Sequence, residues 1–378
     1  MRFGTVAAAP PGMPAGCRGR LVEVDRFEWR LGDGGDPAEL VADFCALYAE
    51  PHTDTDGSIC GVAVLVSAAA GAVMVGGATG AHTPIAAVPD VALVAFRHGP
   101  ERAPAPPGEF GVGAWSRSWS GADHAKAVMA VQEAIGRGEV YQACVVGHRS
   151  APWHGDAARA AAAVCGIEGA AWGGVLAGED WMVATGSGEC FLESDGTTAS
   201  TYPIKGTAPA TDAGLAELAA SVKERAEHVM IVDLERNDLA RVAVPGTVTV
   251  PKLFRLRRWA DLWEAESQVS CRLASDTGMD ELLRAMCPPG SVTGTPKLAM
   301  LDIVAALEPV GRGPAMGGFG YFSGGRLRLG VSIRTVAFDA ERVHVWAGGG
   351  ITWRSDPGAE VAEAEAKAAG VVRALTDA

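Results

Sequence analysis

Positive charge is scarce in this sequence, and the deficit argues against several classes of partner. The 378 residues include 32 Lys and Arg against 45 Asp and Glu, which gives a formal net charge of −13. Such an acidic surface disfavours nonspecific binding to nucleic acid and to anionic membranes. It is compatible with an anionic small-molecule substrate, because that ligand needs only a local cationic pocket. We therefore expect no nucleic-acid and no membrane partner.

Long apolar runs are also missing. No uncharged apolar stretch reaches the roughly 18 residues that a transmembrane helix needs. The first residues, Met1 to Gly4, lead into Ala and Pro without the sustained apolar segment of a secretory signal. These two features favour a cytoplasmic location.

The common cysteine motifs are absent as well. Eight cysteines are spread along the chain, at positions 17, 45, 60, 144, 165, 190, 271 and 287. No two of them form a C-x-x-C pair, and no histidine is spaced with them as in zinc motifs. The pattern indicates buried thiols in a reducing compartment.

Helical and strand patterns follow one another irregularly along the chain. Apolar periodicity and capping residues predict helices at 36–48, 121–136, 157–165, 212–228, 278–286 and 297–307, and a last helix that starts at Asp356-Pro357. Strands are predicted at 62–67, 91–97, 139–147, 172–177, 181–186, 190–200 (with an Asp-Gly turn), 317–322, 327–338 and 343–347. A doubly wound parallel sheet would alternate regularly. We therefore expect an α+β fold with large antiparallel sheets flanked by helices.

The stretch Thr201 to Thr207 holds an unusual lysine. Pro203 fixes its own φ, and Gly206 removes a side chain beside Lys205, so that a ligand or another backbone can approach closely. The preceding hairpin pattern predicts that Lys205 lies at the end of a strand, where the chain enters a loop. On spacing alone, a tight turn with a solvated lysine is the favoured explanation, and the other segments of the chain argue against it.

Two helices each carry a pair of glutamates three residues apart. Glu224 and Glu227 fall in one helix, and Glu360 and Glu363 in the last one, where Lys367 shares their face. Four carboxylates on two helix faces offer the oxygen ligands that Mg²⁺ prefers. The alternative is two solvated helix faces.

Two further segments have the composition of an anion site. Arg334 is the one arginine of the apolar segment 329–335; it is either a surface residue or a buried guanidinium that binds a carboxylate. The run Gly348 to Gly350 is either a turn or a source of free backbone N–H groups for a carboxylate. Neither this run nor the loop 290–297 has the glycine pattern of a dinucleotide or P-loop site.

Together these segments resemble the chorismate-utilising enzymes. The resemblance rests on the segments 227–239 (Glu-His-Val-Met-Ile-Val-Asp-Leu-Glu-Arg-Asn-Asp-Leu), 289–297 (Pro-Gly-Ser-Val-Thr-Gly-Thr-Pro-Lys), 332–335 (Ser-Ile-Arg-Thr), 348–351 (Gly-Gly-Gly-Ile) and 355–367 (Ser-Asp-Pro with later Glu, Glu and Lys). It implies the fold of anthranilate synthase component I. Residues 115–378 would form the chorismate-binding catalytic region, and residues 1–114 a divergent N-terminal part of the same fold.

Within this family, Pro-Ile-Lys-Gly-Thr (203–207) is similar to the aminodeoxychorismate synthase component I branch, whereas the anthranilate branch usually has Ala where Lys205 stands. The resemblance implies that the 4-hydroxyl of chorismate is replaced by an amino group, on the route to p-aminobenzoate and folate. A glutamine amidotransferase partner would supply the ammonia. Two alternatives stay open: anthranilate synthase component I or another chorismate-converting enzyme, and a noncatalytic homologue.

The resemblance also implies roles for individual residues. Glu189 would be the general acid and Lys205 the covalent nucleophile, whereas Gln142 occupies the position of a lysine base in relatives that use water. The metal set for Mg²⁺ would be Glu227 and Glu363, supported by Glu224 and Glu360. The residues expected to bind substrate are Gln142, Gly206, Thr207, Ser291, Arg334, Gly348, Gly350 and Lys367.

Three positions depart from the family pattern. Ser267 stands where a histidine is common, and Ala315 where many members have a tyrosine that helps to bind a substrate carboxylate. The segment 187–189 reads Ser-Gly-Glu in place of Ser-Pro-Glu. The first two departures favour the noncatalytic alternative, and the retained lysine, glutamates and arginine oppose it.

Overall fold

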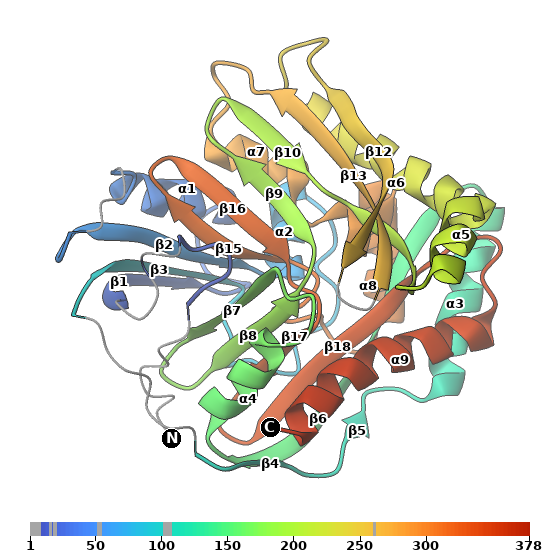
Figure 1. The fold of residues 1–378 in the computed structure, drawn as a ribbon, viewed down its shortest axis with the longest axis horizontal. Coiled ribbons are helices and arrows are strands. Elements are labelled where there is room, and N and C mark those ends of the chain that lie inside the picture. The colour runs from blue at the N-terminus through green and yellow to red at the C-terminus, as the bar shows by residue number, and fades with distance from the viewer. Residues whose placement is uncertain (1–8, 15–16, 18–20, 51–54, 101–107, 260–261) are drawn as a thin grey trace.

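Two antiparallel sheets form the frame of the protein (Figure 1). The computed structural model describes residues 9–14, 17, 21–50, 55–100, 108–259 and 262–378. Within these residues every strand pairing is antiparallel. The predicted α+β fold with large antiparallel sheets is confirmed.

The larger sheet has ten strands, in the order β1-β3-β2-β15-β16-β9-β10-β13-β11, with β12 paired to β13. The bounds of its strands are β1 Leu21–Trp29, β2 Ile59–Val66, β3 Val91–His98, β9 Cys190–Ser194, β10 Thr198–Thr201, β11 Ile204–Pro209, β12 Thr249–Trp259, β13 Leu262–Arg272, β15 Gly318–Ser323 and β16 Arg326–Val331. Because β2 pairs with β15, the N-terminal strands share one sheet with a segment from the far end of the chain. The division at residues 114 and 115 stays a prediction.

The smaller sheet has eight strands, in the order β14-β6-β18-β17-β8-β7, with β4 and β5 paired to β6. Its strands are β4 Phe110–Val112, β5 Ser116–Arg117, β6 Gln142–Gly155, β7 Trp172–Ala177, β8 Met182–Ser187, β14 Gly294–Thr295, β17 Thr335–Phe338 and β18 Arg342–Ile351. The three glycines of residues 348–350 lie inside β18, paired with β6, and do not form the turn considered from the sequence.

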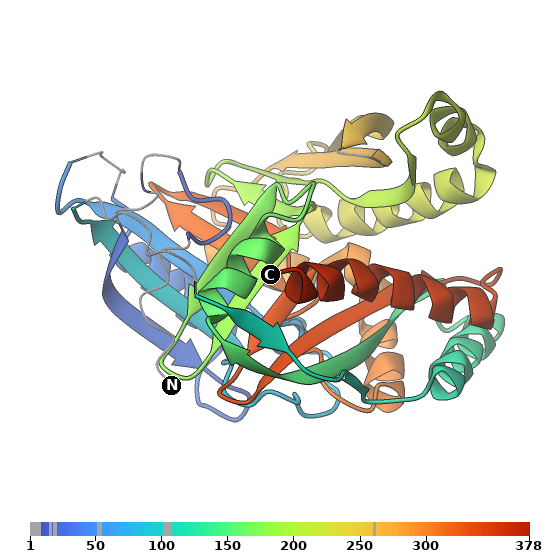
Figure 2. The same cartoon turned by 60° about the horizontal axis from the view of Figure 1, so that its bottom comes forward.

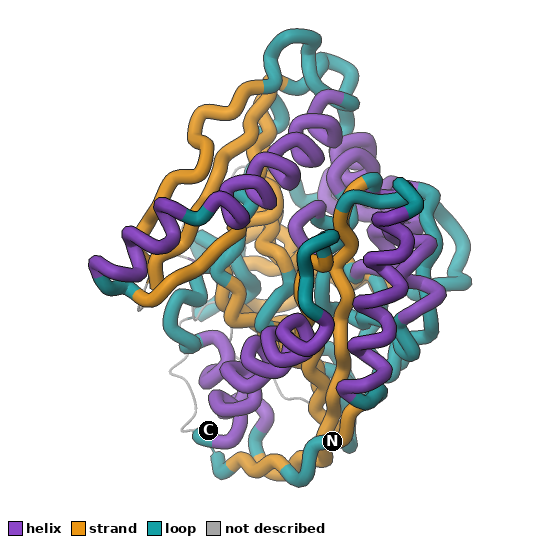
Figure 3. The backbone as a smooth tube through the Cα atoms, turned by 90° about the vertical axis from the view of Figure 1, so that its right-hand side faces the viewer, coloured by secondary structure: helices purple, strands orange, loops and turns teal. Residues whose placement is uncertain are grey.

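Helices cover the outer faces of both sheets (Figures 2 and 3). They are α1 Pro37–Leu47, α2 Ala68–Val75, α3 Gly121–Gly136, α4 Ala157–Cys165, α5 Asp212–Ala220, α6 Val222–Ala240, α7 Met279–Met286, α8 Lys297–Leu307 and α9 Pro357–Thr376, with a short 3₁₀ turn, η2, at Gly290–Val292. None of the helices in the described ranges has the length and hydrophobicity needed to cross a membrane.

The predicted helix 212–228 is wrong in extent, because Ser221 divides it. Ser221 has an extended backbone (ψ 107°), and its hydroxyl accepts a hydrogen bond from the N–H of Glu224 at 3.2 Å. This is the geometry of an N-cap, so a new helix starts there. Glu224 and Glu227 consequently lie in the first two turns of α6.

The predicted strand 327–338 is also wrong, since it is two strands in two different sheets. β16 ends at Val331, and β17 begins at Thr335 and pairs with β8. Arg334 lies in the break with φ +50°, and its carbonyl accepts the N–H of Gly186 at 3.0 Å. The chain crosses here between the sheets, which a local apolar pattern does not reveal.

A buried ion pair ties the end of α8 to the smaller sheet. Arg312 donates to the Glu308 carboxylate through Nε at 2.9 Å and Nη2 at 2.7 Å. The same guanidinium donates to the carbonyls of Val292 and Cys144, at 2.9 and 2.8 Å. It therefore fixes η2 relative to the start of β6, which carries Gln142.

We expect Arg312→Ala to lower the free energy of unfolding by about 3–5 kcal/mol, because it leaves the buried Glu308 carboxylate without a cation. Urea unfolding followed by circular dichroism measures the change. Arg236→Ala is the matched control, since its partner Asp233 is 76% exposed. That control is expected to cost less than about 1 kcal/mol, and an equal effect of the two variants would contradict the prediction.

Candidate active site

Lys205 lies where β11, η2 and β18 meet. It is the second residue of β11, and therefore near the start of a strand where the sequence predicted the end of one. Its Nζ donates to the carbonyl of Ser291 at 3.2 Å. A Cβ at Gly350 would lie 3.5 Å from that Nζ and 2.0 Å from Gln142 Nε2, so any larger residue there would displace the glutamine side chain. The lysine, the glutamine and the glycine strand are thus brought together.

Glu189 is buried beside this lysine, in the connection between β8 and β9. The side chain is only 6% exposed. Burial raises the pKa of Glu189 to about 7, although the Ser291 hydroxyl, the charge of Lys205 and a backbone hydrogen bond from Ile204 act in the opposite direction. A carboxyl with this pKa holds a proton for a large part of the time near neutral pH. It has the property that a general acid needs.

The glutamates of α6 and α9 face one another next to β18. A Cβ at Gly349 would lie 3.0 Å from Glu360 Oε2 and 3.7 Å from Glu363 Oε1. On the α6 side, burial raises the pKa of Glu227; Lys223 and Lys205 lower it, and Glu224 and Glu360 add to the rise. Carboxylates from the two helices therefore sense one another's charge.

These carboxylates fit a magnesium ion that keeps part of its water shell. All four glutamates are described, and no three of them have oxygens that all lie within 4.8 Å of one another. Mg²⁺ commonly binds through one or two carboxylates and several waters, so two of these glutamates would be enough to hold it. A cation there would also favour the charged form of Glu227, which burial and its acidic neighbours disfavour.

Lys367 connects this acidic cluster to the glycine strand. Its Nζ lies 2.7 Å from Glu363 Oε1 and donates to the carbonyl of Gly348 at 3.1 Å. Burial raises the pKa of Glu363, but Lys367, together with Lys223 and Lys205, brings it below its ordinary value. Glu363 therefore ionises more readily than Glu227, whose pKa is raised.

Arg334 lies near the buried carboxyl groups of Glu264 and Glu189. It is half-buried, and its charge opposes the burial that raises the pKa of Glu264 on β13. Glu264 in turn raises the pKa of Glu189. The positive-φ backbone at residue 334 turns the chain at the junction of the two sheets. The carbonyl of Arg334 accepts the N–H of Gly186 on β8, which brings this residue to the strand that leads into Glu189.

Two predicted substrate-binding positions lie on β11 after the lysine. Gly206 has φ +82°, and a Cβ there would lie 3.0 Å from Glu224 Oε2. Glycine is therefore needed both for the backbone and for the close approach of α6. Thr207 is exposed and is opposite Glu264 in the strand register. The catalytic and binding roles of all these residues stay predictions.

Sequence reasoning missed the histidine next to Glu227. His228 is fully buried, and its Nδ1 lies 3.4 Å from the carbonyl of Lys205. Burial lowers the pKa of His228 to about 4, so the ring is neutral near pH 7. Its ring packs edge-on against Phe254. The histidine holds the backbone of β11 at Lys205 against α6. Its position inside the family-like segment 227–239 is the sequence feature that could have revealed it.

A second missed group lies beneath η2. Lys297 Nζ is 2.8 Å from Asp238 Oδ2 and donates to the carbonyl of Met286 at 2.8 Å. Burial and the nearby Asp238 raise the pKa of Glu235. A Cβ at Gly290 would lie 2.6 Å from Glu235 Oε1. This buried polar group supports the turn that carries Ser291.

The two departures from the family pattern are both buried. Ser267 accepts a hydrogen bond from the N–H of Phe254 at 2.9 Å, where the backbone of β12 has φ +51°. Its own N–H donates to the carbonyl of Pro203 at 3.1 Å. Ser267 thus stabilises the irregular strand next to the lysine segment. Ala315 is 1% exposed and lies in the turn after Arg312.

Comparisons with known proteins agree with this arrangement. The chorismate binding enzyme family matches residues 78–373. Anthranilate synthase component 1 1 of Halobacterium salinarum is 38% identical over 260 residues, 66% of this chain and 49% of that protein. Aminodeoxychorismate synthase component 1 of Salmonella typhimurium is 34% identical over 257 residues, 66% of this chain and 57% of that protein. The chain thus matches about half the length of these relatives.

Solved structures share the fold at low sequence identity. Anthranilate synthase component I from Streptococcus pneumoniae has a TM-score of 0.81 at 21% identity, covering 94% of this chain and 91% of that one. The isochorismate synthase MenF from Escherichia coli has a TM-score of 0.67 at 17% identity, covering 99% of this chain and 97% of that one. With a match over more than half of its length, the chain belongs to the chorismate binding enzyme family.

Proposed function

We propose that this protein acts as an aminodeoxychorismate synthase component I, which converts chorismate and ammonia to 4-amino-4-deoxychorismate. The observation that carries the proposal is the Lys205 amine beside the buried Glu189 carboxyl, in the site bordered by the acidic faces of α6 and α9. Relatives named aminodeoxychorismate synthase component 1 lend support, from Salmonella typhimurium and Escherichia coli. Residues 115–378 would form the catalytic region.

The first step joins the substrate to the lysine. The uncharged Lys205 amine adds to C2 of the ring, the ring double bonds shift, and the C4–O bond breaks. The leaving hydroxyl takes the proton of Glu189 and departs as water. The amine that was added loses a proton to solvent, which leaves a neutral secondary amine on C2 and Glu189 as a carboxylate.

The second step releases the product. Ammonia adds to C4, the double bonds shift back, and the bond between C2 and the lysine nitrogen breaks. The departing nitrogen regains its proton, and the carboxylate of Glu189 takes the proton that the new C4 amine loses. The sum is chorismate and ammonia giving aminodeoxychorismate and water. Gln142, beside Gly350, has no basic atom with which to activate water, which favours an amine over a hydroxyl product.

Binding uses the charged groups around the lysine. Mg²⁺, held by Glu227 and Glu363 with support from Glu224 and Glu360, would supply a positive charge for the ring carboxylate of the substrate. Arg334 and the backbone at Gly348 and Gly350 would hold the enolpyruvyl carboxylate. We further propose that the ammonia comes from a glutamine amidotransferase partner, that the product serves p-aminobenzoate and folate synthesis, and that the protein is cytoplasmic.

The metal assignment predicts a graded response. Glu227→Gln removes a proposed direct ligand and is expected to abolish Mg²⁺-dependent turnover at ordinary Mg²⁺ concentrations. Glu224→Gln removes a residue that supports the ligands without binding the metal directly, and it is expected to weaken Mg²⁺ binding about 10–100-fold. Activity against Mg²⁺ concentration measures both, with the exposed Glu217→Gln on α5 as control. Equal Mg²⁺ dependence in all three variants would contradict the assignment.

One product assay tests the proposed function. The protein is incubated with chorismate, Mg²⁺ and excess ammonium at mildly alkaline pH, so that no amidotransferase is needed, and products are identified by mass and absorbance. Aminodeoxychorismate is the expected product. Anthranilate would place the protein in the other branch, for which the Halobacterium salinarum relative is named. Chorismate binding without turnover would identify a noncatalytic homologue.

A further inference from the structure

Three side chains with metal-binding atoms converge at one end of the larger sheet. They are Cys17, Cys60 and His98, and all three are at most 1% exposed. One ligand atom from each lies within 4.8 Å of the other two. Among the residues that the structure describes, no other group of three His, Cys, Asp or Glu side chains has this property.

The fold creates this convergence through a β-bulge. β2 pairs with β3 at Ile59↔Arg97 and Gly61↔Phe96, so Cys60 is the extra residue between the two pairs. A bulge of this kind re-aims a side chain relative to the regular strand. His98 is the last residue of β3, and Cys17 comes from the segment before β1. The three residues are therefore brought together by tertiary structure, across spacings that match no zinc motif.

The histidine is oriented like a metal ligand. Its Nε2 lies 3.4 Å from Cys17 Sγ, and its Nδ1 lies 3.3 Å from the hydroxyl of Ser58. A hydrogen bond from Nδ1 to the hydroxyl leaves the lone pair of Nε2 directed at the cysteine side. Histidines that bind metals commonly have their second nitrogen held by such a partner.

A buried phenol completes the surroundings. The ring of Tyr321 lies against Gly61, where a Cβ would be 2.9 Å from Tyr321 Cε1. Its hydroxyl is buried and has no hydrogen-bond partner in the described part of the chain. Such a group is unfavourable unless something nearby accepts its proton, and a thiolate is a strong acceptor.

We propose that Cys17, Cys60 and His98 form a structural zinc site. Two sulfurs and one imidazole nitrogen are ligands that Zn²⁺ prefers, and they supply three of its four tetrahedral positions. Binding releases the two thiol protons and leaves thiolates, one of which the Tyr321 hydroxyl can hydrogen-bond. The ion would tie Cys17 to the bulge of β2.

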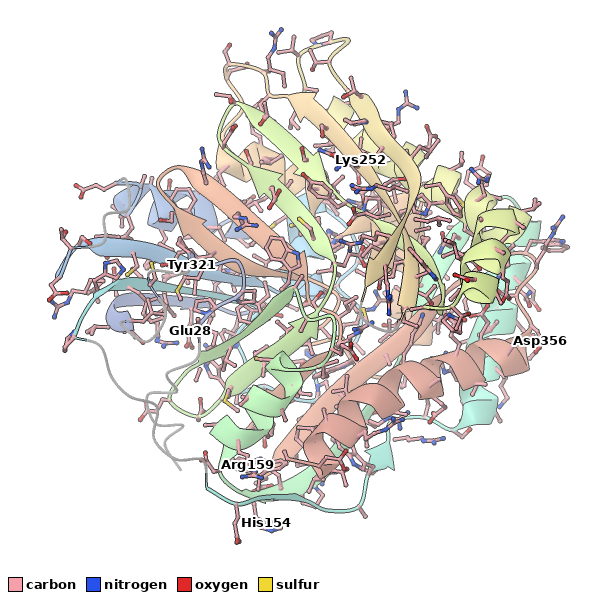
Figure 4. The ribbon with its side chains drawn as sticks, in the orientation of Figure 1. Glu28, His154, Arg159, Lys252, Tyr321 and Asp356 are labelled. Atoms are coloured by element: carbon pink, nitrogen blue, oxygen red, sulfur yellow. The ribbon has the colours of Figure 1, made fainter. Side chains whose placement is uncertain are left out.

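The proposed zinc site is separate from the catalytic one. Figure 4 shows Tyr321 among the strands at the left of the molecule, and Asp356, at the start of α9, at the far right. All the proposed catalytic residues, including Lys205 and Glu189, lie outside this group. The inference therefore stands or falls independently of the reaction that the protein catalyses.

Co²⁺, which takes tetrahedral sulfur and nitrogen sites like zinc, tests the proposal on the full chain. The reduced, metal-free protein is titrated with Co²⁺ and followed by absorbance. We expect one ion per chain, with thiolate-to-cobalt charge-transfer bands and the strong d–d absorption of tetrahedral geometry. Added Zn²⁺ should displace the cobalt and remove both signals. A reduced wild-type protein that shows neither signal overturns the proposal.

Variants locate the ion. Cys17→Ala and Cys60→Ala are each expected to weaken the charge-transfer band and to bind Co²⁺ at least tenfold less tightly. Cys45→Ala removes an equally buried thiol of α1 that is not in the cluster, and it should keep the full spectrum. Near-ultraviolet circular dichroism confirms that each variant is folded. An unchanged spectrum in both cluster variants would refute the site, whatever the wild type binds.

Discussion

Lys205→Ala is expected to stop formation of aminodeoxychorismate. If the lysine is the covalent nucleophile, its neighbours Gln142 and Ser291 carry no amine that could replace it, and the amine of Lys367 is held by Glu363 at 2.7 Å. The rate should fall by about 10⁴-fold or more, on the scale seen when a covalent nucleophile is removed. Product formation from chorismate, Mg²⁺ and ammonium, measured by chromatography and mass, gives the result.

The same variant has a second readout in the intact protein. Without ammonia, the wild-type protein should gain the mass of chorismate minus water, carried on a peptide that contains Lys205, and the alanine variant should not. Lys252→Ala is the control, because this lysine is exposed on β12. An unchanged rate in Lys205→Ala would remove the covalent role of the lysine and leave the family assignment intact.

Local signals predicted those elements whose ends are capped by their own residues. The helices 121–136 and 157–165 agree with α3 and α4 to the residue, and both begin at a side-chain cap. The helix 297–307 also agrees with α8, although no side chain caps its start. In α3, the hydroxyl of Ser120 accepts the N–H of Asp123 at 3.1 Å, and in α9 the carboxylate of Asp356 accepts the N–H of Ala359 at 2.8 Å. The capping residue and the N–H that it accepts lie only three residues apart, so the cap can be recognised from the local sequence.

Features that depend on distant segments were missed for a physical reason. The apolar residues on both sides of Arg334 are typical of one strand, yet the two halves pair with different sheets. The choice is made by partners such as β8 and β9, more than 130 residues earlier in the chain. The cluster of Cys17, Cys60 and His98 is likewise a consequence of strand register. Neither is encoded at short range.

The sequence pointed to the proposed catalytic and metal-binding residues, but not to the residues that hold them in place. Lys205 stood out because it lies between Pro-Ile and Gly-Thr, a pattern with few structural uses. Glu227 stood out because it is one of a pair of glutamates three residues apart. The groups that hold them in place, among them His228 and Glu235, look like ordinary helix residues in the sequence. Their burial, 0% and 2% exposed, appears only when α6 packs against β11 and η2. Supporting residues are recognised by environment, and the environment is tertiary.

Glu189→Gln is expected to lower the rate of amino transfer by about 10²–10⁴-fold, the usual contribution of a general acid. The amide keeps the shape and the hydrogen bond from Ser291 but cannot protonate the leaving hydroxyl. Because burial raises the pKa of Glu189 to about 7, the acid is protonated below that pH and loses its proton above it. In the wild type, kcat/KM for chorismate should therefore decline with an apparent pKa near 7.

The pH dependence of kcat/KM distinguishes loss of the general acid from a general loss of folded protein. The decline should disappear in Glu189→Gln, whereas Glu179→Gln, an exposed control, should keep the wild-type profile. Glu264→Gln provides a sharper comparison, since the charge of Glu264 adds to the raised pKa of Glu189. Removing that charge should move the alkaline limb to lower pH while the acid itself stays in place. If the limb stays at the same pH in both Glu189→Gln and Glu264→Gln, another group supplies the proton, and the role assigned to Glu189 is wrong.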